Sequence, residues 1–267
     1  QARDEDPAVR VAALRAMRRI VGPEDVAPLI AVVKTNPDGA ERVAAISALV
    51  SACGDDEASG ARVLSELNQA SDPAQKDAWA RVLTAVGYSK ALPTILEGLE
   101  DDDQEVVATT VTYLSQWPDP TPIDALFAVV ESDADSPAKR RAVSAVIQLT
   151  TTAASRKQRP DEVLAEWFGR ASAEVETVEE KRQLLSGLAR VHTLGSLRLL
   201  EPYLVDEEVQ TEAFYALLAI GSPLVRAGEH AAVKKVLPEA TAIQERELVW
   251  RIARLRRQVA AAESPQE

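Results

Sequence analysis

The sequence has little of what metal centres, disulfide frameworks and membrane spans require. Cys53 is the only cysteine in 267 residues, which excludes an internal disulfide. The chain has 11 glycines and 2 histidines. No Gly-rich phosphate loop occurs, and neither His is followed by Glu. No apolar run approaches the roughly 20 residues that cross a bilayer. We therefore expect no cofactor, no metal site and no membrane insertion.

A catalytic constellation is also missing from the sequence. His192 and His230 lie in different parts of the chain, and neither has a Ser or Cys partner or a Gly-x-Ser-x-Gly motif nearby. Carboxylates are abundant, but their spacing singles out no pair. Acidic runs such as 101–103 lack the glycine and the ligand spacing of a calcium loop, which favours helix capping. We assign no catalytic residue and predict a protein that is not an enzyme.

The formal net charge of −12 is unevenly distributed. Residues 1–93 carry 11 basic and 13 acidic side chains, residues 94–212 carry 11 and 23, and residues 213–267 carry 8 and 6. The three parts thus have net charges of −2, −12 and +2. Such a chain repels phosphate backbones, so we predict no nucleic-acid partner.

What the sequence does contain is a repeated helical pattern, clearest at residues 6–35. Asp6 is a helix-capping residue, and Pro7 suits the first helical turn. Gly22-Pro23 ends the first predicted helix and starts a second. Apolar residues recur in the first helix at three- and four-residue steps, namely Val9, Ala12, Ala13, Ala16, Met17 and Ile20. Two such short helices need neighbours of the same kind to bury their apolar sides.

The pattern continues along the chain in units near 6–35, 37–70, 72–100, 103–131, 136–171, 175–204 and 206–240. A last, Arg-rich helix is predicted at 242–260. Within the pattern, the polar run from Thr150 to Pro160 is predicted to be a loop, and Gly221-Ser222-Pro223 to break a helix. We therefore predict an all-α fold, a right-handed α-α superhelix of about seven helix pairs with a C-terminal capping helix. It would form one domain over 1–267.

The first unit resembles a HEAT repeat in its short bacterial form. The resemblance rests on Asp6-Pro7-x-Val9-Arg10-x-Ala12-Ala13, on Leu14, and on a second helix that ends in Leu29-Ile30. Looser echoes occur at Asp72-Pro73 and at 206–209, and the Arg after the first apolar residue is absent from most later units. The resemblance implies a HEAT-like helical solenoid over nearly the whole chain.

A second resemblance covers residues 179–220, which look like the helical-repeat segment of large multidomain bacterial proteins. There such a segment often stands beside a sugar-active β-sandwich or a c-type cytochrome domain. This implies a non-catalytic spacer or docking module of a larger protein that is periplasmic or secreted, with a cytoplasmic location as the alternative. The chain begins at Gln1, and we expect it to be a processed or trimmed piece.

By analogy with HEAT arrays, the second helix of each pair lines the concave side. Aligning these helices on their apolar pairs places four glutamates at solvent-facing positions: Glu66, Glu97, Glu166 and Glu201. One hypothesis is an acidic inner surface for a basic or polar partner segment, and the alternative is ordinary exposed glutamates. Trp167 is a further candidate for partner contact, although core packing of Trp167 and Phe168 is favoured.

The function that these observations favour is a non-enzymatic protein-interaction scaffold or spacer, monomeric, with a protein partner along its concave face. The alternative is a HEAT-like enzyme, either a DNA glycosylase or a bilin lyase. The basic cluster at Lys234, Lys235, Arg251, Arg254, Arg256 and Arg257 is interpreted as a solvated outer face of the capping helix, with a docking patch as the alternative. Cys53 is expected to be a buried small apolar residue.

Overall fold

The structure is a computed structural model that describes residues 4–35, 39–132, 136–238 and 245–263. In these ranges the regular elements are all helices, α or 3-10, and none is a strand. The chain divides into two compact units, Gln1–Pro122 and Ile123–Glu267. The boundary falls inside the predicted repeat 103–131, between its two helices.

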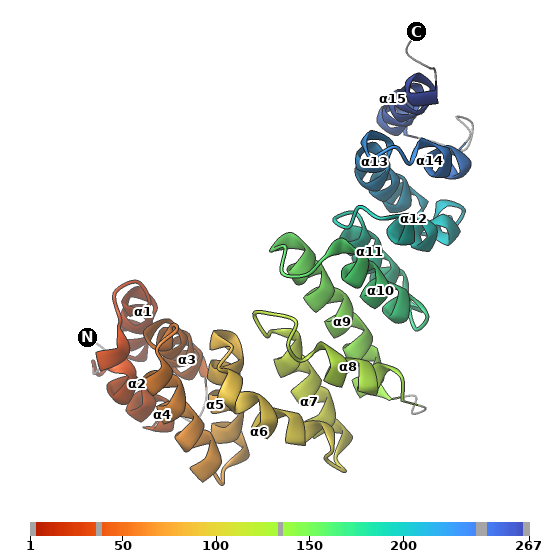
Figure 1. Ribbon diagram of the computed structural model, residues 1–267. Helices are drawn as coiled ribbons and strands as arrows, with labels where there is room; N and C mark the ends of the chain where they lie inside the picture. The colour runs from red at the N-terminus through yellow and green to blue at the C-terminus, as the bar shows by residue number, and fades with distance from the viewer. Residues whose placement is uncertain (1–3, 36–38, 133–135, 239–244, 264–267) are drawn as a thin grey trace. The chain divides into compact units, whose positions relative to one another are not determined.

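The first unit consists of helices that alternate between a first and a second member of a pair (Figure 1). The first helices pack on one another in chain order, α1 on α3, α3 on α5 and α5 on α7. In the second layer, α2 packs on α3, α4 packs on α5 and η3 packs on α7. The elements are α1 (Pro7–Met17), α2 (Val26–Thr35), α3 (Gly39–Cys53), α4 (Glu57–Gln69), α5 (Pro73–Val86), α6 (Leu92–Leu96), η3 (Glu97–Leu99) and α7 (Gln104–Ser115).

The second unit repeats this arrangement. Its first helices α9, α11, α13 and α15 pack in sequence, and α10 packs on α12 in the other layer. Counted along the chain, the described residues contain fifteen α-helices, the number that the predicted seven pairs and one final helix require. The elements are α8 (Ile123–Val130), α9 (Pro137–Ser155), α10 (Asp161–Ser172), α11 (Val178–Leu188), α12 (Leu194–Leu200), η4 (Glu201–Leu204), α13 (Gln210–Arg226), α14 (His230–Val236) and α15 (Arg246–Glu263).

A recurrent polar contact joins successive first helices. In several first helices, the fourth residue after the N-cap is cationic. Its side chain reaches the start of the first helix of the following repeat. Arg10 of α1 pairs with Glu41 at 2.8 Å, and Arg42 of α3 donates to the carbonyl oxygen of Ala74. Lys181 of α11 pairs with Asp206 at 2.7 Å, just before α13. These contacts fix the spacing between neighbouring repeats, which apolar packing alone would leave adjustable.

Arg140 of α9 occupies the same position and lies 3.0 Å from Glu176 and 3.7 Å from the buried Glu180. Glu180 itself accepts hydrogen bonds from the backbone N–H groups of Glu176 and Thr177, both at 3.0 Å. The cation therefore recurs in more repeats than the apolar alignment indicated. The cations occupy equivalent positions when residues are counted from the N-cap of each first helix. Counting from the first apolar residue hides this equivalence.

Three sequence-based boundaries differ from those of the structure. The predicted loop from Thr150 to Pro160 is helical as far as Ser155, since Thr150 Oγ1 donates to the carbonyl of Val146 at 2.7 Å and leaves no orphan hydroxyl. Helix α13 runs through Pro223 to Arg226. The capping helix is shifted to Arg246–Glu263, and residues 242–244 lie outside the described ranges.

The predicted apolar stripe of α1 is also displaced. Val9 is 37% exposed and Ile20 82% exposed, whereas Leu14 is fully buried. Ile20 lies beyond the end of α1, in the turn before the second helix. The short helix thus contacts its neighbour through Leu14 and the half-buried residues around it.

Close approach between helices is possible in the second unit because α11 has a glycine at the contact. A Cβ atom at Gly187 would lie 2.5 Å from Phe168 Cζ and 2.5 Å from Thr151 Oγ1. Phe168 is fully buried, so its ring has no free space to move into. By contrast, a Cβ atom at Gly169 of α10 would make ordinary contacts of 3.7 and 3.8 Å with Leu199.

Gly187→Ala should therefore destabilise the protein by ~1–3 kcal/mol through overpacking. Gly169→Ala should stabilise it by ~0.5–1 kcal/mol, because alanine favours the helical backbone and fits the available space. Thermal unfolding followed by circular dichroism measures both. Equal effects of the two substitutions would contradict the close packing assigned to Gly187.

The Lys181 contact predicts a pH effect. The hydrogen bond from Lys181, followed by that from the backbone N–H of Glu208, lowers the pKa of Asp206 from its ordinary value. Because the folded pKa is below the unfolded one, the contribution to stability is present above the unfolded pKa and is lost as the pH falls through the folded pKa.

Lys181→Met should raise the pKa of Asp206 part of the way to its ordinary value, since the Glu208 N–H remains. Carbon-13 NMR titration of the side-chain carboxyl measures this pKa directly. Lys235→Met, at an exposed position of α14, should leave it unchanged. An unaltered Asp206 titration in Lys181→Met would show that the contact does not form in solution.

Candidate functional site

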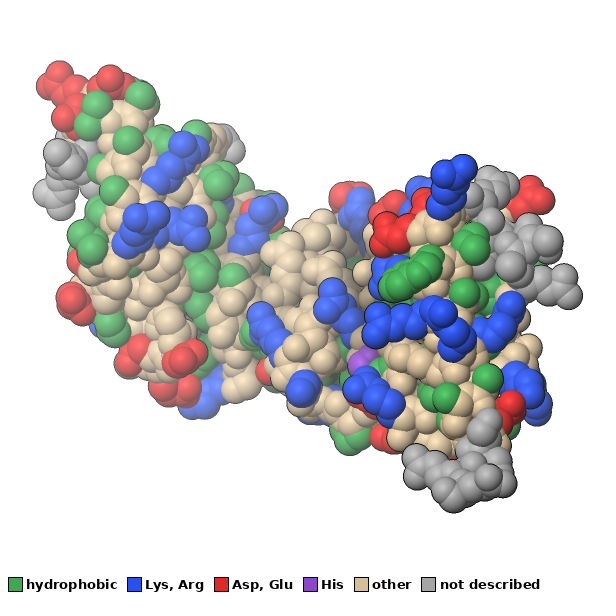
Figure 2. All heavy atoms as spheres, turned by 90° about the horizontal axis from the view of Figure 1, so that it is seen from above, with side chains coloured by type: hydrophobic (Ala, Val, Ile, Leu, Met, Phe, Trp, Pro, Cys, Tyr) green, Lys and Arg blue, Asp and Glu red, His purple; other side chains and the backbone are tan. Residues whose placement is uncertain are grey.

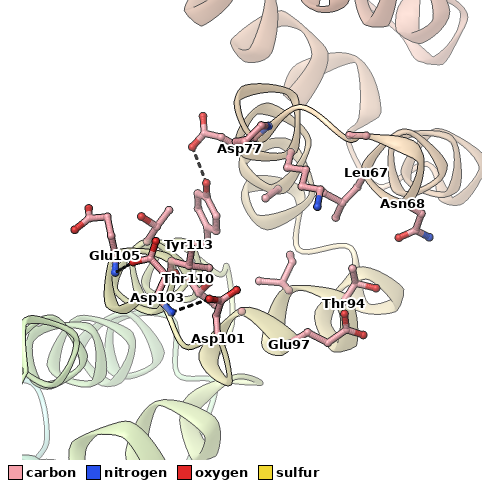
Figure 3. A pocket seen from close by; sticks show the side chains of 18 residues that line it. Leu67, Asn68, Asp77, Thr94, Glu97, Asp101, Asp103, Glu105, Thr110 and Tyr113 are labelled. Atoms are coloured by element: carbon pink, nitrogen blue, oxygen red, sulfur yellow. Dashed lines mark hydrogen bonds between the residues drawn. The ribbon is translucent and has the colours of Figure 1, made fainter. Parts of the chain in front are cut away.

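A polar hollow of the first unit lies among the later helices of that unit. We call it the α4–α7 groove; it has a volume of about 630 Å³. Leu67 and Asn68 come from the end of α4, Thr94 and Glu97 from α6 and the start of η3, and Tyr113 from α7 (Figure 3). Three consecutive helix pairs therefore contribute to this groove, as expected for a surface built by stacking repeats.

The lining of the α4–α7 groove is strongly acidic. It includes one amine, Lys76, and five carboxylates, those of Asp77, Glu97, Asp101, Asp103 and Glu105. In the close view, Glu97 and the acidic turn before α7 lie on neighbouring parts of the rim (Figure 3). A hollow with several converging carboxylates attracts cations and cationic side chains more strongly than a flat surface of equal charge.

A hydrogen-bond network holds one wall of the groove. The hydroxyl of Tyr113 donates to Asp77 Oδ1 at 2.6 Å, and Arg81 Nε donates to both oxygens of the same carboxylate at 3.0 and 2.9 Å. Burial, together with the neighbouring Asp77 carboxylate, raises the pKa of Tyr113, so the phenol stays protonated and remains a donor. The network joins α5 to α7 across the floor of the groove.

The acidic turn before α7 has a structural role as well. Asp103 is the N-cap of α7 and accepts a hydrogen bond from the N–H of Glu105 at 2.9 Å. Asp101 accepts one from the N–H of Asp103 at 2.8 Å. Helix capping was the predicted role of this run and is confirmed. Each of these hydrogen bonds engages one oxygen of its carboxylate.

The predicted partner-binding residues lie in different environments. Glu97 is exposed and lines the α4–α7 groove. Glu66 pairs with Lys34 at 2.5 Å, and 20% of its side chain is exposed. Glu66 is therefore half-buried and ion-paired with a lysine of α2, and its role in partner binding stays a prediction.

The other three predicted residues belong to the second unit. Glu166 is exposed and lines a hollow of about 700 Å³ that also contains His192, Arg198 and Glu229, so its lining carries both signs of charge. Glu201 is exposed at the start of η4 and lines neither this hollow nor the groove. Trp167 is half-buried, while Phe168 is in the core as expected. A common acidic surface for all four glutamates stays a prediction.

The thiol of Cys53 lies inside the protein at the end of α3. Cys53 is 1% exposed, and burial, with a smaller effect of Asp56, raises the pKa of its thiol to about 11. Its predicted role as a buried apolar residue agrees with this environment.

Within the described ranges, no group of three or more His, Cys, Asp or Glu side chains is placed to hold a metal ion.

The sequence analysis missed one exposed aromatic residue. Trp250 of α15 is 59% exposed, whereas Leu248, Ile252 and Leu255 of the same helix are buried. The signal was present in the sequence, since position 250 falls between the members of a regular apolar stripe and must face away from the core.

The geometry defines a protein of stacked helix pairs whose hollows lie between repeats. The comparison with known families agrees: the family model for HEAT repeats matches residues 61–147. This match and the all-helical structure of the described residues support a HEAT-repeat helical solenoid.

HEAT repeats are generally protein-interaction scaffolds and typically lack enzymatic activity. A comparison with curated proteins finds no match to this chain. Among the helices of the described residues, none has both the length and the apolar content of a membrane span.

Proposed function

We propose that this chain is a non-enzymatic interaction scaffold whose α4–α7 groove binds a basic segment of a protein partner. The observation that supports the proposal is the excess of carboxylates over amines in a concave lining. Lysine and arginine side chains of an extended or helical segment would pair with Glu97 and the acidic turn before α7, while their aliphatic parts cover Leu67 and Ile95.

The proposal includes a monomeric chain and, from the second resemblance, a place within a larger multidomain protein. A groove of this kind gives specificity and a fast association rate more than a large binding energy. Moderate, salt-sensitive affinity is therefore expected, in keeping with a docking module. The acidic lining counts against the glycosylase alternative, because it repels the phosphates that such an enzyme must hold.

The test is affinity capture from a lysate of the source cell, comparing wild type with a chain carrying Glu97→Gln and Asp101→Asn. Asparagine keeps the side-chain oxygen that accepts the Asp103 N–H, so the turn should persist. A partner held by the groove should be retained by wild type, and its affinity for the variant should fall at least ~tenfold, as is common when charges central to an interface are removed.

The matched control carries Glu100→Gln and Asp102→Asn, which remove the same charge from exposed neighbours outside the groove lining. It should retain the partner. If both variants lost the partner equally, the loss would be an effect of overall charge, and the groove would not be the binding site. Loss only when Glu66, Glu97, Glu166 and Glu201 are all changed to Gln would favour the wider acidic surface instead.

A further inference from the structure

The last two first helices of the second unit form a separate surface with the opposite charge. We call it the α13–α15 face and define it by Leu218 and Arg226 of α13 and by Trp250, Arg251 and Arg254 of α15. These residues line a hollow of about 550 Å³. Figure 2 shows the molecule from the end at which α15 lies in Figure 1, and there several Lys and Arg side chains lie beside an exposed hydrophobic side chain, with Asp or Glu side chains on its other side. The surface shares no residue with the α4–α7 groove.

Trp250 is unlike two other tryptophans of the chain. Trp79 and Trp117 are 0% and 3% exposed, whereas Trp250 is 59% exposed. A large aromatic ring in water forgoes the stabilisation that burial would give, and exposed aromatic rings beside arginines are typical of binding hot spots. Tyr215 of α13 is 38% exposed as well. Tyr215 donates a hydrogen bond to Glu245 at 3.2 Å, so Trp250 is the more exposed of the two rings.

The arginines of this face are weakly paired within the chain. Arg251 lies 3.6 Å from Glu247 and has its guanidinium 5.4 Å from the centre of the Tyr215 ring. Arg226 Nε donates to the backbone oxygen of Ser222 at a long 3.4 Å. For Arg254, the described residues contain no carboxylate within salt-bridge distance. Three guanidinium groups therefore face the hollow with a single carboxylate, Glu247, in its lining.

We propose that the α13–α15 face is a second docking surface, and that its occupant is an acidic protein segment that also carries an apolar or aromatic side chain. Each guanidinium can bind a carboxylate through two parallel N–H donors. Trp250 and Leu218 would cover the apolar side chain. This proposal does not depend on a partner in the α4–α7 groove.

A polypeptide fits the face better than a nucleic acid does. Non-specific binding of single strands needs a continuous basic groove that follows several phosphates, with aromatic rings along it. Here the three arginines occupy one hollow that also contains Glu247, on a chain with a net charge of −12. A short acidic segment needs only the local positive charge, because repulsion from more distant charges is screened beyond about 8–10 Å at physiological salt.

The test selects peptides from a random display library on the immobilised full-length chain. The proposal predicts enrichment of peptides that combine several Asp or Glu residues with an aromatic or aliphatic residue, and loss of that enrichment on a chain carrying Trp250→Ala and Arg254→Glu. Enriched peptides without net negative charge, or no enrichment at all, would overturn it.

A selected peptide is then synthesised with a fluorescent label, and its Kd is measured by anisotropy. Trp250→Ala and Arg254→Glu should each weaken binding at least ~tenfold, whereas Arg257→Glu should change it less than ~twofold. Arg257 is exposed on the same helix but does not line the hollow, so it is a matched control for charge. Circular dichroism checks that each variant remains helical.

Two competing occupants are tested with the same variants. The first competitor is labelled oligo-dT. If it bound more tightly than the peptide, and if Trp250→Ala abolished that binding, the face would be a nucleic-acid site and the proposal would be overturned. Analytical ultracentrifugation that shows self-association of the chain, abolished by Arg254→Glu, would make a second copy the occupant and overturn it too. An equal loss of peptide binding in Arg257→Glu would reduce the effect to general electrostatic attraction.

Discussion

The structure depends on the fact that no helix pair can bury its apolar side alone. Within each unit, successive first helices pack on one another. The packing is close enough in places to demand glycine, as at Gly187 beneath Phe168. Where the cation at the fourth helical position recurs, a charged hydrogen bond joins one repeat to the start of the next.

This construction separates the surfaces from the core and from one another. A groove between neighbouring repeats needs only two or three helix pairs, so its charge can change along the chain without altering the packing elsewhere. The acidic α4–α7 groove and the basic α13–α15 face are examples, each lined by residues from adjacent repeats of one unit. In the proposed scaffold, these two surfaces of opposite charge would hold two segments of different chemistry.

Much of the fold could be predicted because helix caps and apolar periodicity are local signals. Asp6, Asp72 and Asp103 each cap a helix where the sequence predicted a repeat to begin. Predictions failed at two residues that the sequence suggested would interrupt a helix. Pro223 continues α13 although proline usually ends a helix, and Thr150 is buried within α9 because its hydroxyl bonds to the preceding turn.

The candidate site was less predictable because it depends on which repeats meet. Glu97 was identified from its position on a second helix, but the other carboxylates of the groove come from α5 and from the turn before α7. Glu66 was equivalent to Glu97 in the alignment, yet Lys34 of the preceding repeat pairs with it. Sequence periodicity locates a residue on its own helix and contains no information about the side chains that the neighbouring repeat brings to it.

Hydrogen exchange measured by mass spectrometry on the chain, alone and with its captured partner, is the most direct test of the proposed docking. The groove proposal predicts slower exchange on binding in residues 94–113, which contain Glu97, the acidic turn and Tyr113. Protection should be much smaller in α1 and α2. If the partner protected only segments outside residues 67–113, the α4–α7 groove would not be its binding site.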